Sequence, residues 1–264
     1  MLPFAKKRFG QHFLTDRHYI ERIVRAIAPA AGDTMVEIGP GPGALTEPLL
    51  EHLGHLHAVE IDRDLAAALR ERFGADRLSL HQADALAYDF TPLGPGFRAV
   101  GNLPYNISTP FLFHLAGYAD RLRDAVFMLQ KEVVDRMVAA PGSEAYGRLS
   151  VMLQVRFTMK RLFDVPPGAF TPPPKVDSAI VRMVPLPDTR LRARDEALFA
   201  RMVTAGFGQR RKTLANTLKL FLSAANIETA GIDPRRRAET LSVEEFISLA
   251  DLAAVSRSSG SAGK

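Results

Sequence analysis

The feature that most constrains this chain is a regular alternation of short apolar runs with longer amphipathic segments, which begins at Thr34. The short runs are typical of buried strands, and the longer segments carry apolar residues at the three- and four-residue spacing of surface helices. Strands that alternate with helices form a mostly parallel sheet with helices on both faces. The predicted strands are 34–38, 57–61, 78–82, 98–101 and 125–129, and the predicted helices are 44–53, 63–73, 110–118 and 131–139.

The order of elements changes after Gly147. A helix-like stretch is followed by two strand-like runs, 160–165 and 178–184, with no helix between them, which predicts an antiparallel hairpin at the sheet edge. Beyond them the patterns are helical only, at 196–207, 213–225 and 243–255. We therefore predict an α/β domain over residues 1–187, a small all-helical domain over 188–256 and a disordered tail over 257–264.

Composition excludes several classes of protein. The 264 residues, 47% of them hydrophobic, are enough to bury a sizeable core. The sequence contains no apolar run of the roughly 18 residues that span a membrane, and its start lacks the apolar segment of a signal peptide, so we expect a cytoplasmic protein. The chain has no cysteine, which excludes thiolate nucleophiles, disulfides and the usual zinc knuckles.

Positive charge is gathered in two regions, although the net charge of the chain is only +5. One region opens the chain with Lys6, Lys7 and Arg8, and the other includes the segment Gly208–Leu214. Two basic regions on either side of a nearly neutral middle indicate a polyanionic partner. Solvated helix faces without a specific partner are an equally good interpretation of the charge pattern alone.

A glycine-rich turn, "VEIGPGPGAL", follows the first predicted strand. Gly39 and Gly41 allow the backbone to turn tightly and to approach a ligand closely. Glu60 ends the next strand, where a carboxylate can accept hydrogen bonds from both ribose hydroxyls. These residues predict a nucleotide site, and the loose G-x-G-x-x-A pattern ending at Ala44 leaves a nicotinamide dehydrogenase open.

The third predicted strand ends just before Asp84, beside the same crevice. Its carboxylate could accept a hydrogen bond from an adenine amine, while Ile61 could pack on the adenine face. Asp84 could equally serve as a helix N-cap, and the two roles are compatible.

The stretch "GNLPY" ends the fourth predicted strand at the same sheet edge. The amide of Asn102 and a backbone carbonyl held rigid by Pro104 are two acceptors at a fixed separation, which suits an amine with two hydrogens. Tyr105 offers a face on which a base can stack. The combination indicates a site for the exocyclic N6 of a flipped adenine, where positioning does most of the chemistry.

Nine motifs of the sequence, in order, resemble the ribosomal RNA adenine dimethyltransferases of the small-subunit, kasugamycin-resistance type. They cover nearly the whole chain: "GQHFL", "VEIGPGPGALT", "VEIDRDL", "QADAL", "GNLPYNISTP", "LQKEVVDRM", "YGRLSV", "FTPPPKVDSAIVR" and "QRRKTL". The resemblance implies a Rossmann-like S-adenosylmethionine-dependent methyltransferase sheet with a small helical domain. It also implies N6,N6-dimethylation of two adjacent adenosines in the 3'-terminal hairpin of 16S rRNA, during late assembly of the small subunit.

The resemblance assigns roles to individual residues and implies no metal. In the target site it places Asn102, Leu103, Pro104 and Tyr105, with Phe170 as a second ring closing over the adenine. At His12 the family often carries asparagine. The cofactor S-adenosylmethionine would be bound by His12, Leu14, Gly39, Gly41, Glu60, Ile61, Asp84, Ala85 and Asn102.

The partner implied by the resemblance is small-subunit rRNA within the immature small ribosomal subunit, bound by a monomer. Lys6, Lys7, Arg8, Arg210, Arg211 and Lys212 are the predicted phosphate contacts. Two other functions stay open: a large-subunit dimethyltransferase of the erythromycin-resistance type, and an assembly factor that acts mainly by binding immature small subunits.

Overall fold

A computed structural model describes residues 11–187 and 192–261 of the chain. Their contacts divide them into two compact units. The first contains the residues up to Val134 together with Thr158–Pro185, and the second contains Asp135–Phe157 together with the chain from Leu186 onward. The segment Asp135–Phe157, which the sequence pattern places in the α/β domain, is thus grouped with the C-terminal helices.

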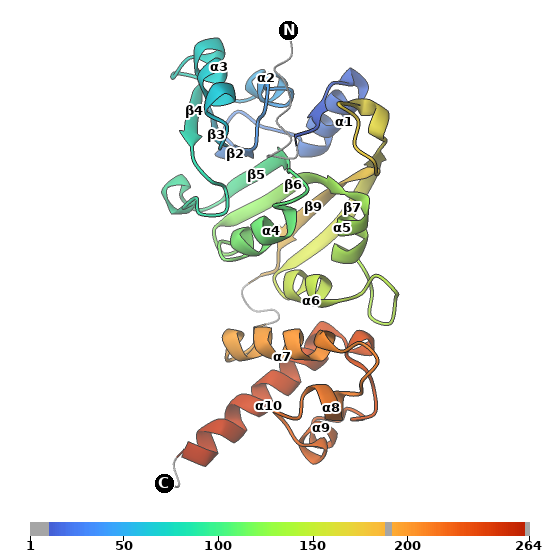
Figure 1. Cartoon of the computed structure of the whole chain (residues 1–264). Helices are drawn as coiled ribbons and strands as arrows, with labels where there is room; N and C mark the ends of the chain where they lie inside the picture. The colour runs from blue at the N-terminus through green and yellow to red at the C-terminus, as the bar shows by residue number, and fades with distance from the viewer. Residues whose placement is uncertain (1–10, 188–191, 262–264) are drawn as a thin grey trace. The chain divides into compact units, whose positions relative to one another are not determined.

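The first unit is built on a seven-stranded sheet with the order β4-β3-β2-β5-β6-β9-β7 (Figure 1). Neighbouring strands from β4 to β6 run parallel, and β9 pairs with β6 in the antiparallel direction, which confirms the predicted sheet and its antiparallel edge. The strands are β2 (Met35–Ile38), β3 (Leu56–Glu60), β4 (Leu78–Gln82), β5 (Phe97–Asn102), β6 (Leu122–Gln130), β7 (Phe157–Val165) and β9 (Ser178–Pro185).

The strand order reverses at β2, which lies between β3 and β5. In open α/β sheets, ligands bind outside the carboxyl ends of the strands at such a point. A separate two-stranded sheet pairs β1 (Phe13–Leu14) with β8 (Phe170–Thr171), and thereby connects the start of the described chain to the segment that precedes β9.

Helices cover both faces of the sheet, because successive side chains of a strand point to opposite faces and both sets are buried in the central strands. On β6, Val126 and Met128 share a buried core with residues of α1 (Arg17–Ile27), α2 (Thr46–Leu50) and α3 (Arg63–Phe73). Phe127, which points the other way, contacts Phe111 at a ring-centroid distance of 5.6 Å. Phe111 belongs to α4 (Ser108–Ala116), and α5 (Lys131–Met137) follows β6 directly; short 3₁₀ turns lie at Thr91–Leu93 and Pro167–Ala169.

The second unit is helical over the residues from 192 that the structure describes. Its buried core joins α6, α7 and α10 to the intervening loops. Gly206 allows this packing, because a Cβ there would lie 3.2 Å from the Cβ of Ala238. The elements are α6 (Arg148–Gln154), α7 (Glu196–Gly208), α8 (Leu214–Thr217), α9 (Ala224–Thr229), the 3₁₀ turn Ala238–Thr240 and α10 (Val243–Ser261).

Some helices differ from the sequence pattern. The predicted helix 44–53 is shortened to α2, with Leu45 as its N-cap and Glu51 as its C-cap. The predicted helix 213–225 is two helices, α8 and α9, because the Ser223 side chain accepts a hydrogen bond from the Asn226 N–H and starts a new helix. By contrast, α10 is longer than predicted, because it continues to Ser261, beyond the predicted end at Val255.

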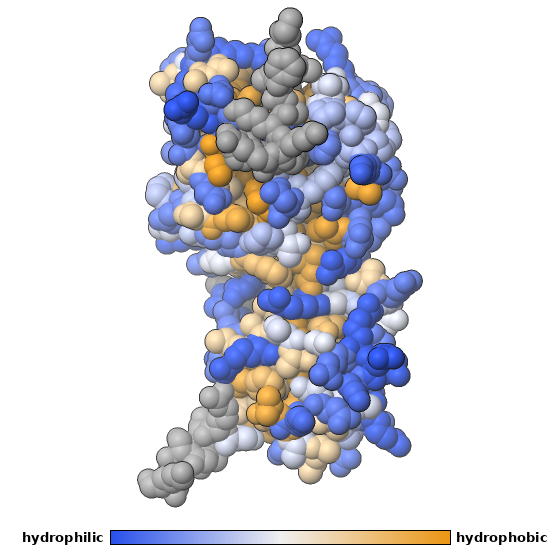
Figure 2. Space-filling view, in the orientation of Figure 1, coloured by the Kyte–Doolittle hydropathy of each residue, from blue (hydrophilic) through white to orange (hydrophobic). Residues whose placement is uncertain are grey.

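Hydrophilic side chains cover much of the face seen in Figure 2, with apolar side chains interspersed among them. Among the described residues, no helix has both the length and the apolar character that crossing a membrane requires.

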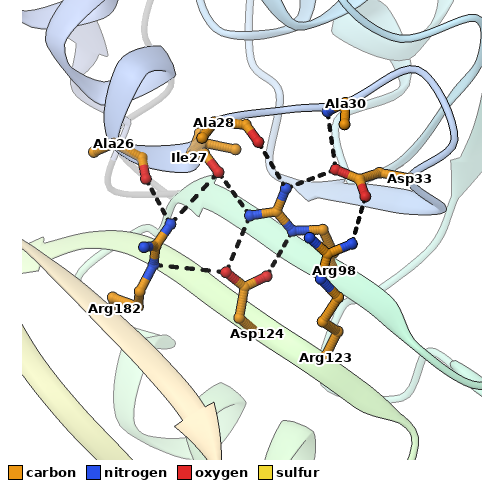
Figure 3. A network of polar contacts seen from close by, with 9 residues as sticks. All are labelled: Ala26, Ile27, Ala28, Ala30, Asp33, Arg98, Arg123, Asp124 and Arg182. Atoms are coloured by element: carbon orange, nitrogen blue, oxygen red, sulfur yellow. Dashed lines mark hydrogen bonds and ion pairs between the residues drawn. The ribbon is translucent and has the colours of Figure 1, made fainter.

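A buried arginine joins the sheet to the end of α1 (Figure 3). Arg98, at the start of β5, is 3% exposed and pairs with Asp124 at 2.6 Å and with Asp33 at 2.7 Å. The same guanidinium donates to the carbonyls of Ile27 and Ala28, which lie at the helix end and lack helical partners. Burial opposes the ionisation of Asp33, but Arg98 and the Ala30 N–H outweigh it and lower the pKa of this carboxyl.

Replacement of Arg98 by leucine is expected to destabilise the protein strongly, because it leaves Asp33 and Asp124 without their buried partner. Loss of one partner of a buried ion pair costs about 3–5 kcal/mol. The measurement is the free energy of unfolding in urea. Arg123→Ala is the control: Arg123 also pairs with Asp33, but its side chain is 58% exposed, so its loss should cost less than about 1 kcal/mol. Equal losses for the two variants would contradict the role assigned to Arg98.

Candidate active site

The glycine turn after β2 adopts a conformation that requires glycine. Gly39 has a φ of 64° and Gly41 a φ of 58°, both in the left-handed region. The Gly41 N–H donates to Oε2 of Glu60 at 3.1 Å, so the turn is tied to the end of the neighbouring strand β3. The backbone of the turn therefore faces the crevice in one fixed shape.

Glu60 is 5% exposed and is held on both sides. Besides the bond from Gly41, its Oε1 accepts the Asp62 N–H at 2.9 Å. Burial disfavours the charged form and raises the pKa of Glu60, although these two backbone donors act in the opposite direction. A carboxylate fixed in this way can accept hydrogen bonds from ribose hydroxyls at the cavity wall without reorganising.

Ile61 and Asp84 lie on the rim of the same crevice. Ile61 is 49% exposed, which leaves its apolar side chain available to a flat ring. Asp84 is exposed, and its Oδ1 accepts the Leu86 N–H at 2.9 Å. This bond closes a turn at 85–87 where the sequence suggested a helix cap, and it occupies only one of the two carboxylate oxygens.

The Asn102–Tyr105 segment begins where β5 passes very close to β2. A Cβ on Gly101 would lie far inside van der Waals contact with the Ile38 carbonyl oxygen, so only glycine permits this approach. The Asn102 Nδ2 donates to the backbone carbonyl of His12 at 3.1 Å. Since the nitrogen of the amide is used, its oxygen is the atom left to accept a hydrogen bond from a ligand.

Tyr105 is anchored from the other side of the site. Its hydroxyl is 2.8 Å from the Ser178 Oγ at the start of β9. Burial raises the pKa of the Tyr105 hydroxyl, while the contact with Ser178 acts in the opposite direction. The ring is thus held by its outer end, and its faces are the part that can contact a base.

One cavity joins these residues, all of them in the first unit. It has a volume of about 220 Å³, against about 10–15 Å³ for one water on the same measure, so it holds a small organic ligand. Its wall is formed at the carboxyl ends of four adjacent strands, β2 to β5, as the switch-point rule predicts. The predicted residues in the wall are His12, Leu14, Gly39, Gly41, Glu60, Ile61, Asp84, Ala85, Asn102, Leu103, Pro104 and Tyr105.

The structure also places in this wall an acidic residue that sequence reasoning missed. Glu37 lies on β2 and is 2% exposed. Its Oε2 accepts a hydrogen bond from the Thr46 hydroxyl at 2.6 Å, and burial raises its pKa to about 7. The available signal was a carboxylate inside an otherwise apolar strand, two residues before the glycine turn.

Phe170 is the predicted target-site residue that the structure places elsewhere. It is 3% exposed and belongs to the buried core shared with α1 and α2, and not to the cavity wall. An aromatic ring gains more from full burial in a core than from a solvated rim, so β8 turns it inward. In this arrangement neither face of the ring is available to a base.

The predicted phosphate contacts that the structure describes belong to the second unit and do not line the cavity of the first. Arg210, Arg211 and Lys212 are exposed on the turn after α7 in the second unit. Arg210 pairs with Glu239 at 3.4 Å and donates to the Glu144 carbonyl. Lys6, Lys7 and Arg8 lie outside the described residues.

The residues present fit a nucleoside cofactor that carries an amino acid. The glycine turn removes side chains from the place where such a group would lie, and Glu60 suits a ribose. Glu37 is a buried carboxyl that could pair with an ammonium group. Asn102 adds an acceptor beside the same cavity. The fold and the site together are typical of a Rossmann-like enzyme that uses a nucleoside cofactor.

The family is shown by comparison with known proteins. The model for the ribosomal RNA adenine dimethylase family matches residues 4–255, and the chain belongs to this family. It is 63% identical, over 93% of its length and 92% of the relative, to "Ribosomal RNA small subunit methyltransferase A" of Aromatoleum aromaticum. It is 59% identical to the protein of the same name from Thiobacillus denitrificans, over 91% of this chain and 94% of the relative.

Two solved structures are similar over almost the whole chain. A dimethyladenosine transferase from Plasmodium falciparum has a TM-score of 0.76 and 25% identity, with 90% of this chain and 96% of that chain covered. The 23S rRNA methyltransferase ErmE has a TM-score of 0.71 and 26% identity, with 92% and 99% covered. The expected fold, enzyme class and S-adenosylmethionine cofactor are confirmed, and the family excludes the nicotinamide dehydrogenase.

Glu37 makes the stability of the ligand-free protein depend on pH. Its pKa of about 7 lies above the ordinary value of 4.5, so its stabilising effect is complete below pH 4.5 and is lost as the pH rises through 7. Glu37→Gln, which keeps an acceptor for Thr46, is expected to gain about 3 kcal/mol over wild type at pH 8.5 and almost nothing at pH 4.5. Urea unfolding at both pH values measures the difference; a gain independent of pH would contradict the assignment.

Proposed function

We propose that this protein transfers methyl groups from S-adenosylmethionine to the N6 atoms of two adjacent adenosines in the 3'-terminal hairpin of small-subunit rRNA. The proposal includes the immature small ribosomal subunit as substrate, in the cytoplasm where ribosomes are assembled, and a monomeric enzyme. The observation that supports it is the Asn102–Tyr105 segment, which lines the cavity and in which the Asn102 amide nitrogen and the Tyr105 hydroxyl already have partners within the protein. The 63% identity to a small-subunit rRNA methyltransferase supports the choice of RNA.

The residues at the end of β5 act by positioning. The Asn102 oxygen and the Leu103 carbonyl, fixed by Pro104 after it, would accept the two N6 hydrogens of the target adenine. This draws the nitrogen lone pair out of conjugation with the ring and directs it toward the cofactor side of the cavity. S-adenosylmethionine, when bound, supplies the electrophilic methyl group. Transfer of the methyl group breaks its bond to the cofactor sulfur, and N6 then releases one proton to solvent. The N6 atom keeps one hydrogen, which either of the two acceptors can hold for a second transfer.

The second unit is proposed to bind the RNA backbone. Arg211 and Lys212 are exposed cations on a short turn, and Arg210 beside them is held by Glu239 and Glu144. Contacts to phosphate position an RNA without reading its sequence, while a splayed base is recognised in a pocket. The cavity of the first unit therefore supplies the selection for adenine.

The large-subunit alternative rests on the similarity to the 23S rRNA methyltransferase ErmE. Its 26% identity is far below the 63% shared with the small-subunit relative, although the folds are alike. Sequence identity at this level supports a common substrate, whereas a common fold does not. We therefore favour the small subunit.

Asn102→Ala tests the chemistry. Removal of one preorganised hydrogen-bonding group from an active site typically costs about 10²–10³ in kcat, and we expect a loss of that order in dimethyladenosine formation on small subunits that lack the modification. Transfer from labelled S-adenosylmethionine is the measurement, with large subunits and naked rRNA as alternative acceptors. Binding of small subunits should persist in the variant. Label in large-subunit RNA alone would move the assignment to the resistance type, and binding without transfer by wild type would favour a pure assembly factor.

Lys212→Gln tests the RNA contact of the second unit. Each phosphate contact contributes about 0.7–0.9 to the slope of log K against log salt, so the slope should become shallower by roughly one unit. Lys160→Gln, which removes an exposed lysine from β7, is the charge-matched control and should leave the slope unchanged. Equal slopes for Lys212→Gln and wild type would remove Lys212 from the interface.

A further inference from the structure

The target site has one aromatic ring from the Asn102–Tyr105 segment, and the structure brings a second ring to it from an unexpected place. The His12 imidazole stacks on Tyr105, with ring centroids 5.7 Å apart and an angle of 28° between the planes. Both residues line the cavity, and both side chains are partly exposed. Phe170, which the family resemblance assigns as the second ring, is buried in the core.

His12 is held firmly in this position. Its Nδ1 lies 2.8 Å from the carbonyl oxygen of Pro172, in the proline-rich segment after β8. That segment is attached to the chain around His12 by the antiparallel pairing of β1 with β8, where Phe13 faces Thr171. The imidazole is therefore fixed both through its backbone and through its own ring nitrogen.

The backbone of His12 also contacts the residue that would hold the target amine. Its carbonyl accepts the Asn102 Nδ2 hydrogen bond at 3.1 Å. Because this bond uses the amide nitrogen, the oxygen of Asn102 is the atom left as the acceptor that an adenine N6 hydrogen requires. His12 is thus next to both parts of the target site, the amide acceptor and the aromatic face.

We propose that His12 forms the second wall of the target-base site, so that the flipped adenine stacks between its imidazole and the ring of Tyr105. Stacked bases lie about 3.4 Å apart, so a base between two rings needs them about 7 Å apart. The 5.7 Å between the ring centroids includes any sideways offset of the rings, so their planes must move apart by at least about 1 Å to admit a base. The two rings thus form a closed pair, and the base would replace the direct His12–Tyr105 contact when it is inserted.

This inference rests on the proposed function and deepens it, since it concerns the same adenine. It differs from the role that the family resemblance gives His12, which is contact with the cofactor. The two roles predict different losses: a cofactor contact affects the Kd of S-adenosylmethionine, whereas a base contact affects the RNA substrate.

The test compares wild type with His12→Ala, which removes the ring, and His12→Phe, which keeps a ring but cannot bond to Pro172. Base-aromatic stacking by alanine substitution is worth about 1–3 kcal/mol, so His12→Ala should lower kcat/KM for small subunits on the order of tenfold. His12→Phe should recover most of this loss. The Kd of S-adenosylmethionine, measured by calorimetry, should stay close to the wild-type value in both variants. His18→Ala, an exposed histidine on α1, is the matched control.

A direct readout of stacking separates this role from a structural one. An RNA hairpin with 2-aminopurine at the target position loses fluorescence when the base stacks on aromatic rings. We expect the quenching to be weaker with His12→Ala, and to be retained with His12→Phe and with Phe170→Leu, which keeps the core apolar.

Any of three results would overturn the proposal. The first is weaker binding of S-adenosylmethionine by His12→Ala with an unchanged kcat/KM for small subunits. The second is an equal loss of kcat/KM in His12→Ala and His12→Phe, and the third is a loss of quenching in Phe170→Leu alone. Absence of methyl transfer by wild type would instead contradict the proposed function.

Discussion

The close approach of β5 to β2 is the constraint on which the site depends. Gly101 has no side chain, and the Ile38 carbonyl oxygen occupies the space that a Cβ would need. This proximity continues past the ends of both strands, where a Cβ on Gly39 would be only 3.8 Å from the backbone oxygen of Asn102. The turn proposed to hold the cofactor and the segment proposed to hold the target are therefore neighbours. In the proposed reaction, this closeness of the two backbones would let the methyl group pass directly between their ligands.

Holding polar groups at this sheet edge costs stability, and other parts of the unit compensate. Glu37 and Glu60 are carboxyls with raised pKa values caused by burial, which is unfavourable for a fold but useful for a cationic or hydroxylated ligand. At the opposite ends of the strands, Arg98 neutralises two buried aspartates and binds the carbonyls at the end of α1. The buried carboxyls at the carboxyl ends of the strands are thus suited to a ligand. The buried ion pairs at the other ends attach α1 to the sheet.

Much of the fold and part of the candidate site could be predicted, because parallel strands deliver their carboxyl ends to one edge. Glu60, Asp84 and Asn102 each end a strand or directly follow one, so their common location follows from the strand pattern. The interruption between α8 and α9 could not be predicted from periodicity, since the apolar spacing continues through Ser223 and only its capping bond starts a new helix. The role of Glu37 was missed because a buried carboxyl within a strand resembles a core position.

The sequence by itself determined the alternation of strands and helices, the glycine turn and the family, because each of these depends on local residue order. Only the tertiary structure decided which side chains meet across the chain. It placed Phe170 in the core, since a large ring is stabilised most by full burial. It also placed His12 against Tyr105, 93 positions further along, where the His12 carbonyl accepts a hydrogen bond from Asn102. Such contacts depend on strand register and packing, which no local pattern of residues records.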